Sequence, residues 1–190
     1  MFFKLNWFIR GMFYKILFGK YLLPSYIGKP VFICNFRKIF IHKRVRIFPG
    51  ARIEPVDANS SITFEDNVAI GQNLHITSKG ALVIGSNTTI LENVMITNID
   101  HDYTEIGVHI LEQKYISRYT SIGKNCFIGY GAVIQAGTVL GEQCIVGANS
   151  VVRGTFPNYC VLVGSPAKIV KRYDVTDCIW RKTDASGKFI

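Results

Sequence analysis

An aliphatic residue recurs at every sixth position through the middle of this 190-residue chain, and no other feature constrains its fold as tightly. A helix cannot use a period of six, because steps of about 100° per residue scatter the repeated side chains over three faces. In extended chain, positions an even number apart share a face, so the repeat marks one buried side of a strand. The clearest run comprises Ile122, Ile128, Ile134, Leu140, Val146 and Val152.

The residues between these aliphatic positions complete the pattern. The residue four positions after each aliphatic one is small, and it lies on the same side of the extended chain. The three positions between them are dominated by glycine, asparagine and glutamine, which is turn chemistry. One large and one small side chain per side therefore enter a core, and three sides make a coil of about eighteen residues. The small residues are Cys126, Ala132, Thr138, Cys144 and Ser150.

Hexapeptide repeats of this kind are typical of a parallel β-helix, whose coils bury their faces only by stacking on neighbours. The earlier chain supplies further coils, because Ile41, Phe64 and Ile84 each begin another run of residues at six-residue steps. The phase slips between Ile76 and Ile84 and is lost near residues 57–61, which we interpret as insertions at corners. The sequence therefore predicts an all-β solenoid.

A longer interruption separates Ile96 from Ile122. We expect residues 102–115 to form a loop that leaves the solenoid immediately after His101. Long loops in compact domains are usually functional or disordered. This loop therefore marks a candidate functional site.

Apolar side chains also occupy the position after each small residue, where the strand points outward. Eighteen-residue spacing stacks Phe127 over Ile145 and Val133 over Val151. Apolar ribs on an outer wall mark an interface or a ligand groove. We therefore expect an oligomer, most simply a homotrimer with three-fold symmetry.

Positive charge is concentrated at the N-terminus. Residues 1–53 contain eleven Lys or Arg and no acid, whereas the remainder holds eleven basic and thirteen acidic residues. Aromatic residues are mixed with the basic ones in residues 1–23, a composition suited to a segment that lies on an anionic bilayer. The alternative is a helix that caps the core and keeps its lysines in water. No nucleic-acid recognition motif accompanies the charge, so we expect no nucleic-acid partner.

These observations divide the chain into three parts. We expect a basic, aromatic and helical segment in residues 1–30, the β-helix in residues 31–172, and a tail without an interpretable motif in residues 173–190. Charged residues interrupt the apolar N-terminus, so no uncharged stretch of about eighteen residues is available to cross a membrane. We expect a cytoplasmic protein, with peripheral contact to the inner membrane face through residues 1–23. The five cysteines lack any C-x-x-C pair, which favours reduced thiols, buried at Cys126 and Cys144.

The hexad run, the motif "NIDHDY" and the segment "VGANSVVRGTFPNYCVLVGSPAKIVKR" together resemble the hexapeptide-repeat O-acetyltransferases, which include maltose, galactoside and surface-polysaccharide acetyltransferases. The resemblance spans about residues 40–172. It implies a left-handed parallel β-helix, an exception to the right-handed crossover preference, and a trimer with active sites between subunits. It also implies transfer of acetyl from acetyl-coenzyme A to a hydroxyl of a saccharide, such as a surface-polysaccharide or glycolipid precursor.

The same resemblance assigns roles by position. His101 matches the family's catalytic base, and the backbone N–H of Tyr130 matches an oxyanion donor that also contacts the coenzyme. Ala148 matches a backbone contact to the pantetheine arm. Lysine stands where arginine commonly meets the coenzyme's phosphates, which keeps the charge but loses bidentate geometry. The remaining positions matched to coenzyme binding are Arg153, Gly154, Lys168 and Lys171.

Histidine suits the role of base, because a reference pKa near 6.5 lets it accept a hydroxyl proton at neutral pH. A backbone N–H aimed at the tetrahedral oxygen would stabilise its charge. Direct transfer of this kind needs no covalent enzyme intermediate and no metal. A zinc site would need three converging imidazoles, and His75, His101 and His109 lack the close spacing of such sites. We interpret His42, His75 and His109 as wall or loop residues.

Other functions stay open at this point. The motifs do not separate hydroxyl from amine acceptors, so an amino-sugar N-acetyltransferase or a serine-type acetyltransferase is an alternative. A non-enzymatic β-helix scaffold is a third interpretation, although a scaffold has no need of a histidine beside an excursion loop. The residues do not name the acceptor sugar, and we assign neither Asp100 nor Asp102 as the orienting partner of His101.

Overall fold

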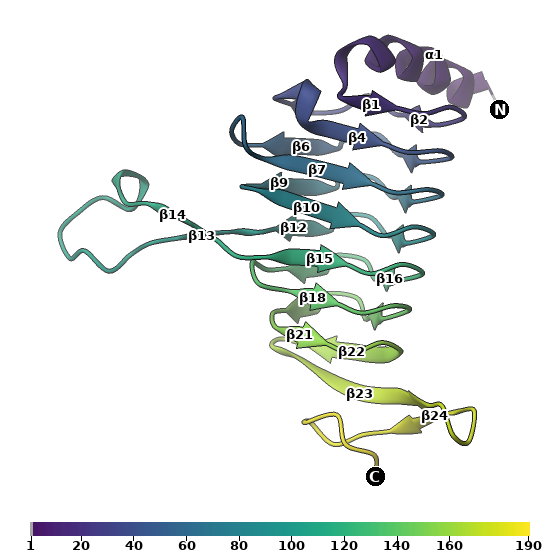
Figure 1. Cartoon of the computed structure of the whole chain (residues 1–190), viewed down its shortest axis with the longest axis vertical. Coiled ribbons are helices and arrows are strands. Elements are labelled where there is room, and N and C mark those ends of the chain that lie inside the picture. The colour runs from purple at the N-terminus through teal and green to yellow at the C-terminus, as the bar shows by residue number, and fades with distance from the viewer. Residues whose placement is uncertain (1) are drawn as a thin grey trace.

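The computed structural model describes the backbone of residues 2–190 and the side chains from Leu5 onward. Within this range, three sheets of short strands form the walls of a left-handed β-helix, stacked along one long axis (Figure 1). We call the sheets walls A, B and C. The chain passes from A to B to C in each coil, so the walls meet at an A–B, a B–C and a C–A corner. The predicted all-β solenoid and its handedness are confirmed.

The strands of each wall follow one another along the axis. Wall A contains β1 (Lys20–Tyr21), β4 (Ile39–Ile41), β7 (Ser61–Phe64), β10 (Ala81–Ile84), β15 (Thr120–Ile122), β18 (Val139–Leu140) and β21 (Thr155–Phe156). Wall B contains β2 (Tyr26–Ile27), β5 (Arg46–Ile47), β8 (Ala69–Ile70), β11 (Thr89–Ile90), β16 (Phe127–Ile128), β19 (Ile145–Val146), β22 (Cys160–Gly164), β23 (Ala167–Asp174) and β24 (Ile179–Lys182). Wall C contains β3 (Phe32–Ile33), β6 (Arg52–Pro55), β9 (His75–Ser78), β12 (Met95–Thr97), β17 (Val133–Ile134) and β20 (Val151–Val152).

The repeated aliphatic residues form the core, as predicted. Each member of the run from Ile122 to Val152 is at most 2% exposed, and the small residues between them, Cys126 and Cys144 included, are equally buried. Parallel pairing places Ile122 beside Leu140, so equivalent side chains of successive coils touch. The outward ribs also form, because Phe127 pairs with Ile145 and Val133 pairs with Val151.

Corners depend on residues that tolerate a left-handed backbone. Asn67 and Asn87 adopt φ of 61° and 59° at the A–B corner, and Asn73 and Asn93 adopt 59° at the B–C corner. Asparagine accepts this conformation more readily than most residues. Its amide also bonds the next coil, since Asn67 Nδ2 donates to Asn87 Oδ1 at 3.0 Å.

The extra residues that disturb the repeat gather at the C–A corner. Ile122 pairs with Leu140, eighteen residues on, whereas Ile41 pairs with Phe64 and Ile84 pairs with Ile122. In each longer coil the additional residues lie between a wall C strand and the following wall A strand. The slips interpreted as corner insertions are therefore confirmed, and one edge of the prism carries the irregular backbone.

The ends of the solenoid lie outside the boundaries expected from the sequence. Helix α1 (Phe2–Leu17) ends well before residue 30, and wall A begins at β1, where Tyr21 pairs with Ile41. In this first coil Tyr21 takes the place of the first aliphatic residue, Ile27 and Ile33 continue the six-residue step, and Phe18 is buried beside them. At the other end β23 and β24 add an antiparallel hairpin to wall B. The tail expected from residue 173 is therefore part of the sheet.

Helix α1 lies across the open end of the first coil (Figure 1). The rings of Phe18 and Phe36 are 5.8 Å apart, and Trp7 lies 5.3 Å from Phe48 between ring centres. A Cβ at Gly11 would collide with the Tyr21 hydroxyl, so glycine permits this close approach. Among the helices described in residues 2–190, none is long and apolar enough to cross a membrane.

We expect Ile134→Ala to lower the free energy of unfolding by about 2–5 kcal/mol, because it leaves a cavity between stacked coils. Val83→Ala, on the outward side of β10, should cost about 1 kcal/mol or less and is the matched control. Urea titration followed by circular dichroism measures both. Equal losses would contradict the inward assignment of the repeat.

Candidate active site

A hairpin leaves the prism at the C–A corner and carries the predicted base. Strands β13 (Ile99–His101) and β14 (Tyr115–Ser117) pair antiparallel, with His101 opposite Tyr115. The hairpin projects sideways from the middle of the stack (Figure 1). Residues 102–114 form its tip, which contains a 3-10 turn at Ile110–Glu112. A 3-10 turn also occurs at Phe36–Lys38, in the first coils.

A cavity of ≈ 430 Å³ lies at the base of this hairpin, on the side of the prism wall. The His101 ring lies 4.8 Å from the Tyr115 ring between centres and meets it edge-on. The exposed imidazole therefore lines this cavity together with charged side chains. The lining residues are Asp100, His101, Asp102, Tyr103, Thr104, Ile116, Arg118 and Arg153.

Asp100 ties the base of the hairpin to the C–A corner that follows β20, two strands beyond β12 along wall C. One of its oxygens, Oδ2, accepts from Arg118 Nε at 3.1 Å and from Arg153 Nη2 at 2.8 Å. Two guanidinium groups on one carboxylate leave this side of the cavity positively charged. No sequence motif assigns Asp100 or Arg118 a role. The positions of these charged residues in the sequence do not predict that they cluster, because the six-residue repeat does not determine where the hairpin rejoins the solenoid.

Neither neighbouring carboxylate orients the imidazole. Asp102 Oδ1 instead accepts from the Thr104 hydroxyl at 2.8 Å and from the Thr104 N–H at 3.1 Å. These hydrogen bonds, chiefly that of the hydroxyl, lower the pKa of Asp102. Within the described part of the chain, the His101 imidazole has no hydrogen-bond partner. Its ring nitrogens are therefore available to a ligand.

Tyr130 and Ala148 lie at a different edge, the B–C corner. Tyr130 occupies the turn between β16 and β17, and Ala148 occupies the same turn one coil later. The two turns are in contact, because Asn149 N–H donates to the Tyr130 carbonyl at 2.8 Å. Among the described residues no acceptor takes the Tyr130 N–H, while its hydroxyl accepts from Asn93 Nδ2 at 2.6 Å. Among the described residues, this corner therefore leaves the Tyr130 N–H without an acceptor.

Lys168 and Lys171 lie on β23, at the end of wall B that follows this corner. They pair with Val163 and Val161 of β22, and both side chains are exposed. The adjoining β24 hairpin surrounds a cavity of ≈ 420 Å³ with aromatic rings, and Tyr173 and Trp180 lie 5.6 Å apart between centres. The sequence analysis found no motif here, because the rings meet only through the pairing of β23 with β24.

The predicted residues therefore form two groups on different edges. His101, Arg153 and Gly154 lie at the C–A corner, whereas Tyr130 and Ala148 lie at the B–C corner, with wall C between them. A wall side of six residues at about 3.3 Å per residue spans roughly 20 Å. One chain alone does not bring the imidazole to the Tyr130 N–H.

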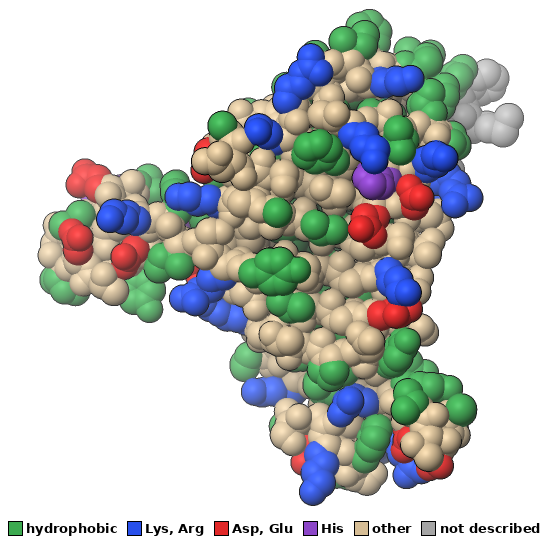
Figure 2. Space-filling model, viewed as in Figure 1, with side chains coloured by type: hydrophobic (Ala, Val, Ile, Leu, Met, Phe, Trp, Pro, Cys, Tyr) green, Lys and Arg blue, Asp and Glu red, His purple; other side chains and the backbone are tan. Residues whose placement is uncertain are grey.

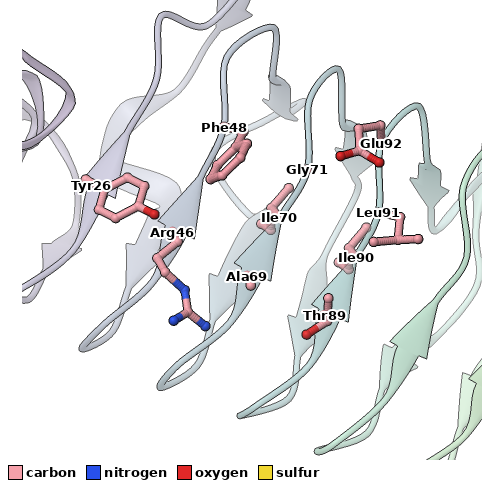
Figure 3. Close-up of a pocket in the computed structure, with 10 residues that line it drawn as sticks. All are labelled: Tyr26, Arg46, Phe48, Ala69, Ile70, Gly71, Thr89, Ile90, Leu91 and Glu92. Atoms are coloured by element: carbon pink, nitrogen blue, oxygen red, sulfur yellow. The ribbon is translucent and has the colours of Figure 1, made fainter. Parts of the chain in front are cut away.

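A shallower hollow of ≈ 220 Å³ lies on wall B near the N-terminal end. Figure 3 shows its lining residues spread over successive strands, with Ala69 and Gly71 leaving space between larger side chains. It contains none of the residues predicted to act on a substrate.

This geometry defines a class: a left-handed β-helix with a histidine-bearing excursion at one corner. The family described as the hexapeptide repeat of succinyl-transferase matches residues 119–153. The putative lipopolysaccharide biosynthesis O-acetyl transferase WbbJ of Escherichia coli K12 is 34% identical over 128 residues, which cover 64% of this chain and 65% of the relative. Galactoside O-acetyltransferase of the same organism is 29% identical over 119 residues, covering 60% and 59%.

Solved structures share the fold. AntD, an N-acyltransferase from Bacillus cereus in complex with dTDP and 3-hydroxybutyryl-CoA, aligns with a TM-score of 0.72 at 17% identity, over 88% of this chain and 90% of that one. A galactoside acetyltransferase in complex with coenzyme A aligns with a TM-score of 0.55 at 19% identity, covering 98% and 89%. Residues 119–153 of the chain thus match the hexapeptide-repeat family, and two of its sequence relatives are named as O-acetyltransferases. The matches span less than two thirds of the length of those two relatives.

We expect Asp100→Ala to loosen the hairpin without unfolding the prism, because exposed ion pairs contribute at most about 1 kcal/mol each. Amides of residues 99–101 and 115–117 should exchange hydrogen up to about fivefold faster. Asp102→Ala, which removes only the local bonds to Thr104, is the control and should leave these amides unchanged. Hydrogen exchange read by mass spectrometry checks both, and equal protection in all three proteins would contradict the tie.

Proposed function

We propose that the protein is an acetyl-coenzyme A-dependent O-acetyltransferase that transfers acetyl to a hydroxyl of a saccharide. The observation that carries this proposal is the His101 imidazole, which lines the cavity and has ring nitrogens without a hydrogen-bond partner among the described residues. A purely structural solenoid would have no use for this arrangement. The named activities of the two Escherichia coli relatives support the choice of an O-linked product.

The chemistry requires two groups of this chain. The His101 imidazole would take the proton of the acceptor hydroxyl as its oxygen attacks the thioester carbonyl. The Tyr130 N–H would stabilise the oxygen anion of the tetrahedral state. When this state collapses the C–S bond breaks, the thiolate of coenzyme A leaves, and the imidazolium returns its proton to the sulfur. The acetyl group moves directly to the acceptor.

A homotrimer would bring the two groups together. In a ring with three-fold symmetry, the C–A corner of one chain can face the B–C corner of the next across wall C. Apolar side chains on the outside of wall C support such packing, since Val133 and Val151 form a rib and Met95 is 37% exposed. Each active site would then lie between two chains.

The coenzyme would lie along the B–C edge. Tyr130 and Ala148 would hold its pantetheine arm through their backbone, and Lys168 and Lys171 would meet its phosphates farther along wall B. Arg153 and Gly154 lie on the other edge, beside His101, and would reach the coenzyme of the neighbouring chain.

The acceptor class is a saccharide, supported by the lipopolysaccharide and galactoside activities of the relatives. We place the reaction in the cytoplasm, where acetyl-coenzyme A is made. An assay with nucleotide sugars and lipid-linked glycans distinguishes the acceptors. Hydroxylamine distinguishes the product, because it cleaves an acetyl ester and leaves the amide of an N-acetyltransferase intact.

We expect His101→Gln to reduce acetyl transfer by at least about a hundredfold, because the base is lost. Acetyl-coenzyme A should still raise the unfolding temperature, since its binding residues are unchanged. His109→Gln, on the same hairpin, is the matched control and should retain activity. Undiminished turnover in His101→Gln would show that His101 is not the base. If acetyl-coenzyme A did not stabilise the native protein, the result would favour a scaffold.

Active sites shared between chains make a second prediction. Ala148→Arg should block the coenzyme at the exposed B–C corner, and His101→Gln removes the base at the other corner. Each variant alone should be inactive. Random co-assembly of the two in trimers leaves about one quarter of the sites with both native corners, so co-expression should restore about that share of activity. Restoration to no more than the level of either variant would place the whole site in one chain.

A further inference from the structure

Helix α1 has a second apolar face that the prism does not cover. Its inner face, with Trp7, Gly11 and Tyr14, packs on the first coils, and Phe18 follows directly after the helix. A surface helix of a globular protein ordinarily carries one apolar stripe, facing the core. Here the opposite side is also apolar and is 43–71% exposed; it comprises Leu5, Ile9, Met12, Phe13 and Ile16.

The spacing of these outward residues makes one continuous stripe. They recur three and four positions apart, so they lie along one side of the helix. A shallow hollow of ≈ 240 Å³ runs between Ile9, Met12, Phe13 and Ile16. An apolar stripe left open on the surface marks a site of association.

Basic side chains border the stripe. At about 100° per residue, Arg10 and Lys15 lie on opposite flanks of the outward face. The exposed lysines and arginines of the adjoining coils, including Lys20, Lys29 and Arg37, add to this charge. Residues 1–53 contain no acidic residue to offset it. Figure 2 shows hydrophobic side chains along the helical end of the molecule, with Lys and Arg beside them.

We propose that the outward face of α1 binds an anionic lipid surface and holds the prism end-on against it. A bilayer would bury the apolar stripe among its acyl chains, and its anionic headgroups would lie beside the basic side chains on both flanks. An apolar groove of a partner protein would satisfy the stripe alone and would leave the flanking charges without purpose.

This orientation determines where the candidate active site lies. Because α1 lies across the end of the stack, the long axis of the prism points away from the lipid (Figure 1). The hairpin with His101 leaves the fourth coil from that end, and coils are about 4.8 Å apart, so it lies roughly 14 Å along the axis from the first coil. If the protein is the acetyltransferase proposed above, we infer that its acceptor is a saccharide carried on a lipid. In the proposed trimer three helices would bind one plane, which raises avidity.

Vesicle sedimentation of the full chain tests the proposal. Vesicles of roughly three parts phosphatidylcholine to one part phosphatidylglycerol should bind the native protein, and phosphatidylcholine alone should bind it far less. The double substitution Phe13→Asp with Ile16→Asp should weaken binding at least tenfold, because two exposed apolar side chains are lost. Lys15→Gln should weaken it about fivefold, and the difference should shrink at high salt.

The matched control is Val175→Asp with Ile190→Asp, which adds the same charges at exposed apolar residues far along the chain, at the other end. It should bind as the native protein does. Undiminished vesicle binding by the Phe13→Asp, Ile16→Asp protein would overturn the proposal. It would also be overturned if the native protein did not bind anionic vesicles and light scattering showed that this variant had lost an oligomer, because the face would then bind a second copy of the chain. Stabilisation by acetyl-coenzyme A should persist in every variant, so a failure of membrane binding is distinguishable from a failure of the proposed function.

Discussion

The stacking of one coil on the next underlies every other feature of this protein. A single coil cannot bury its own aliphatic side chains, and its backbone groups need partners above and below. Ile128 therefore depends on Ile90 on one side and Val146 on the other, through parallel pairs that fix the height of each corner. Because the walls are rigid, a turn such as that of Tyr130 is held in place by the turn containing Ala148 beneath it.

Rigid walls also decide where variation is tolerated. The A–B and B–C corners are short and place mostly asparagine or glycine in the left-handed conformation, with Arg44, Gln143 and Tyr159 as the other such residues of the A–B corner, while the C–A corner accepts insertions of several lengths. The hairpin bearing His101 is the largest of these, and Asp100 with Arg118 and Arg153 ties it to the regular part. The His101 side chain, carried on this hairpin, is thus attached to a rigid scaffold.

Both ends of the prism must be covered, because a solenoid core is open along its axis. At one end α1 covers the first coil with aromatic side chains; at the other, β23 and β24 turn antiparallel and end the parallel ladder. Each cover has a second property. The helix presents an apolar outer face flanked by basic side chains, and the hairpin carries Lys168, Lys171 and a cavity lined by aromatic rings.

The amino-acid sequence by itself determined the solenoid, its inward residues and the stacking of Phe127 on Ile145, because a local period decides which side of an extended chain is buried. It also placed His101 beside an excursion. The prediction of helix for residues 18–30 was wrong, because a first coil begins there with Tyr21 in the place of the first aliphatic residue and Ile27 in the next. Only the tertiary structure decided that Asp100 forms ion pairs with two arginines, that the Tyr173 and Trp180 rings are in contact, and that His101 and Tyr130 lie on separate edges. Those relations depend on where a hairpin returns and on the width of a wall, which no local pattern encodes.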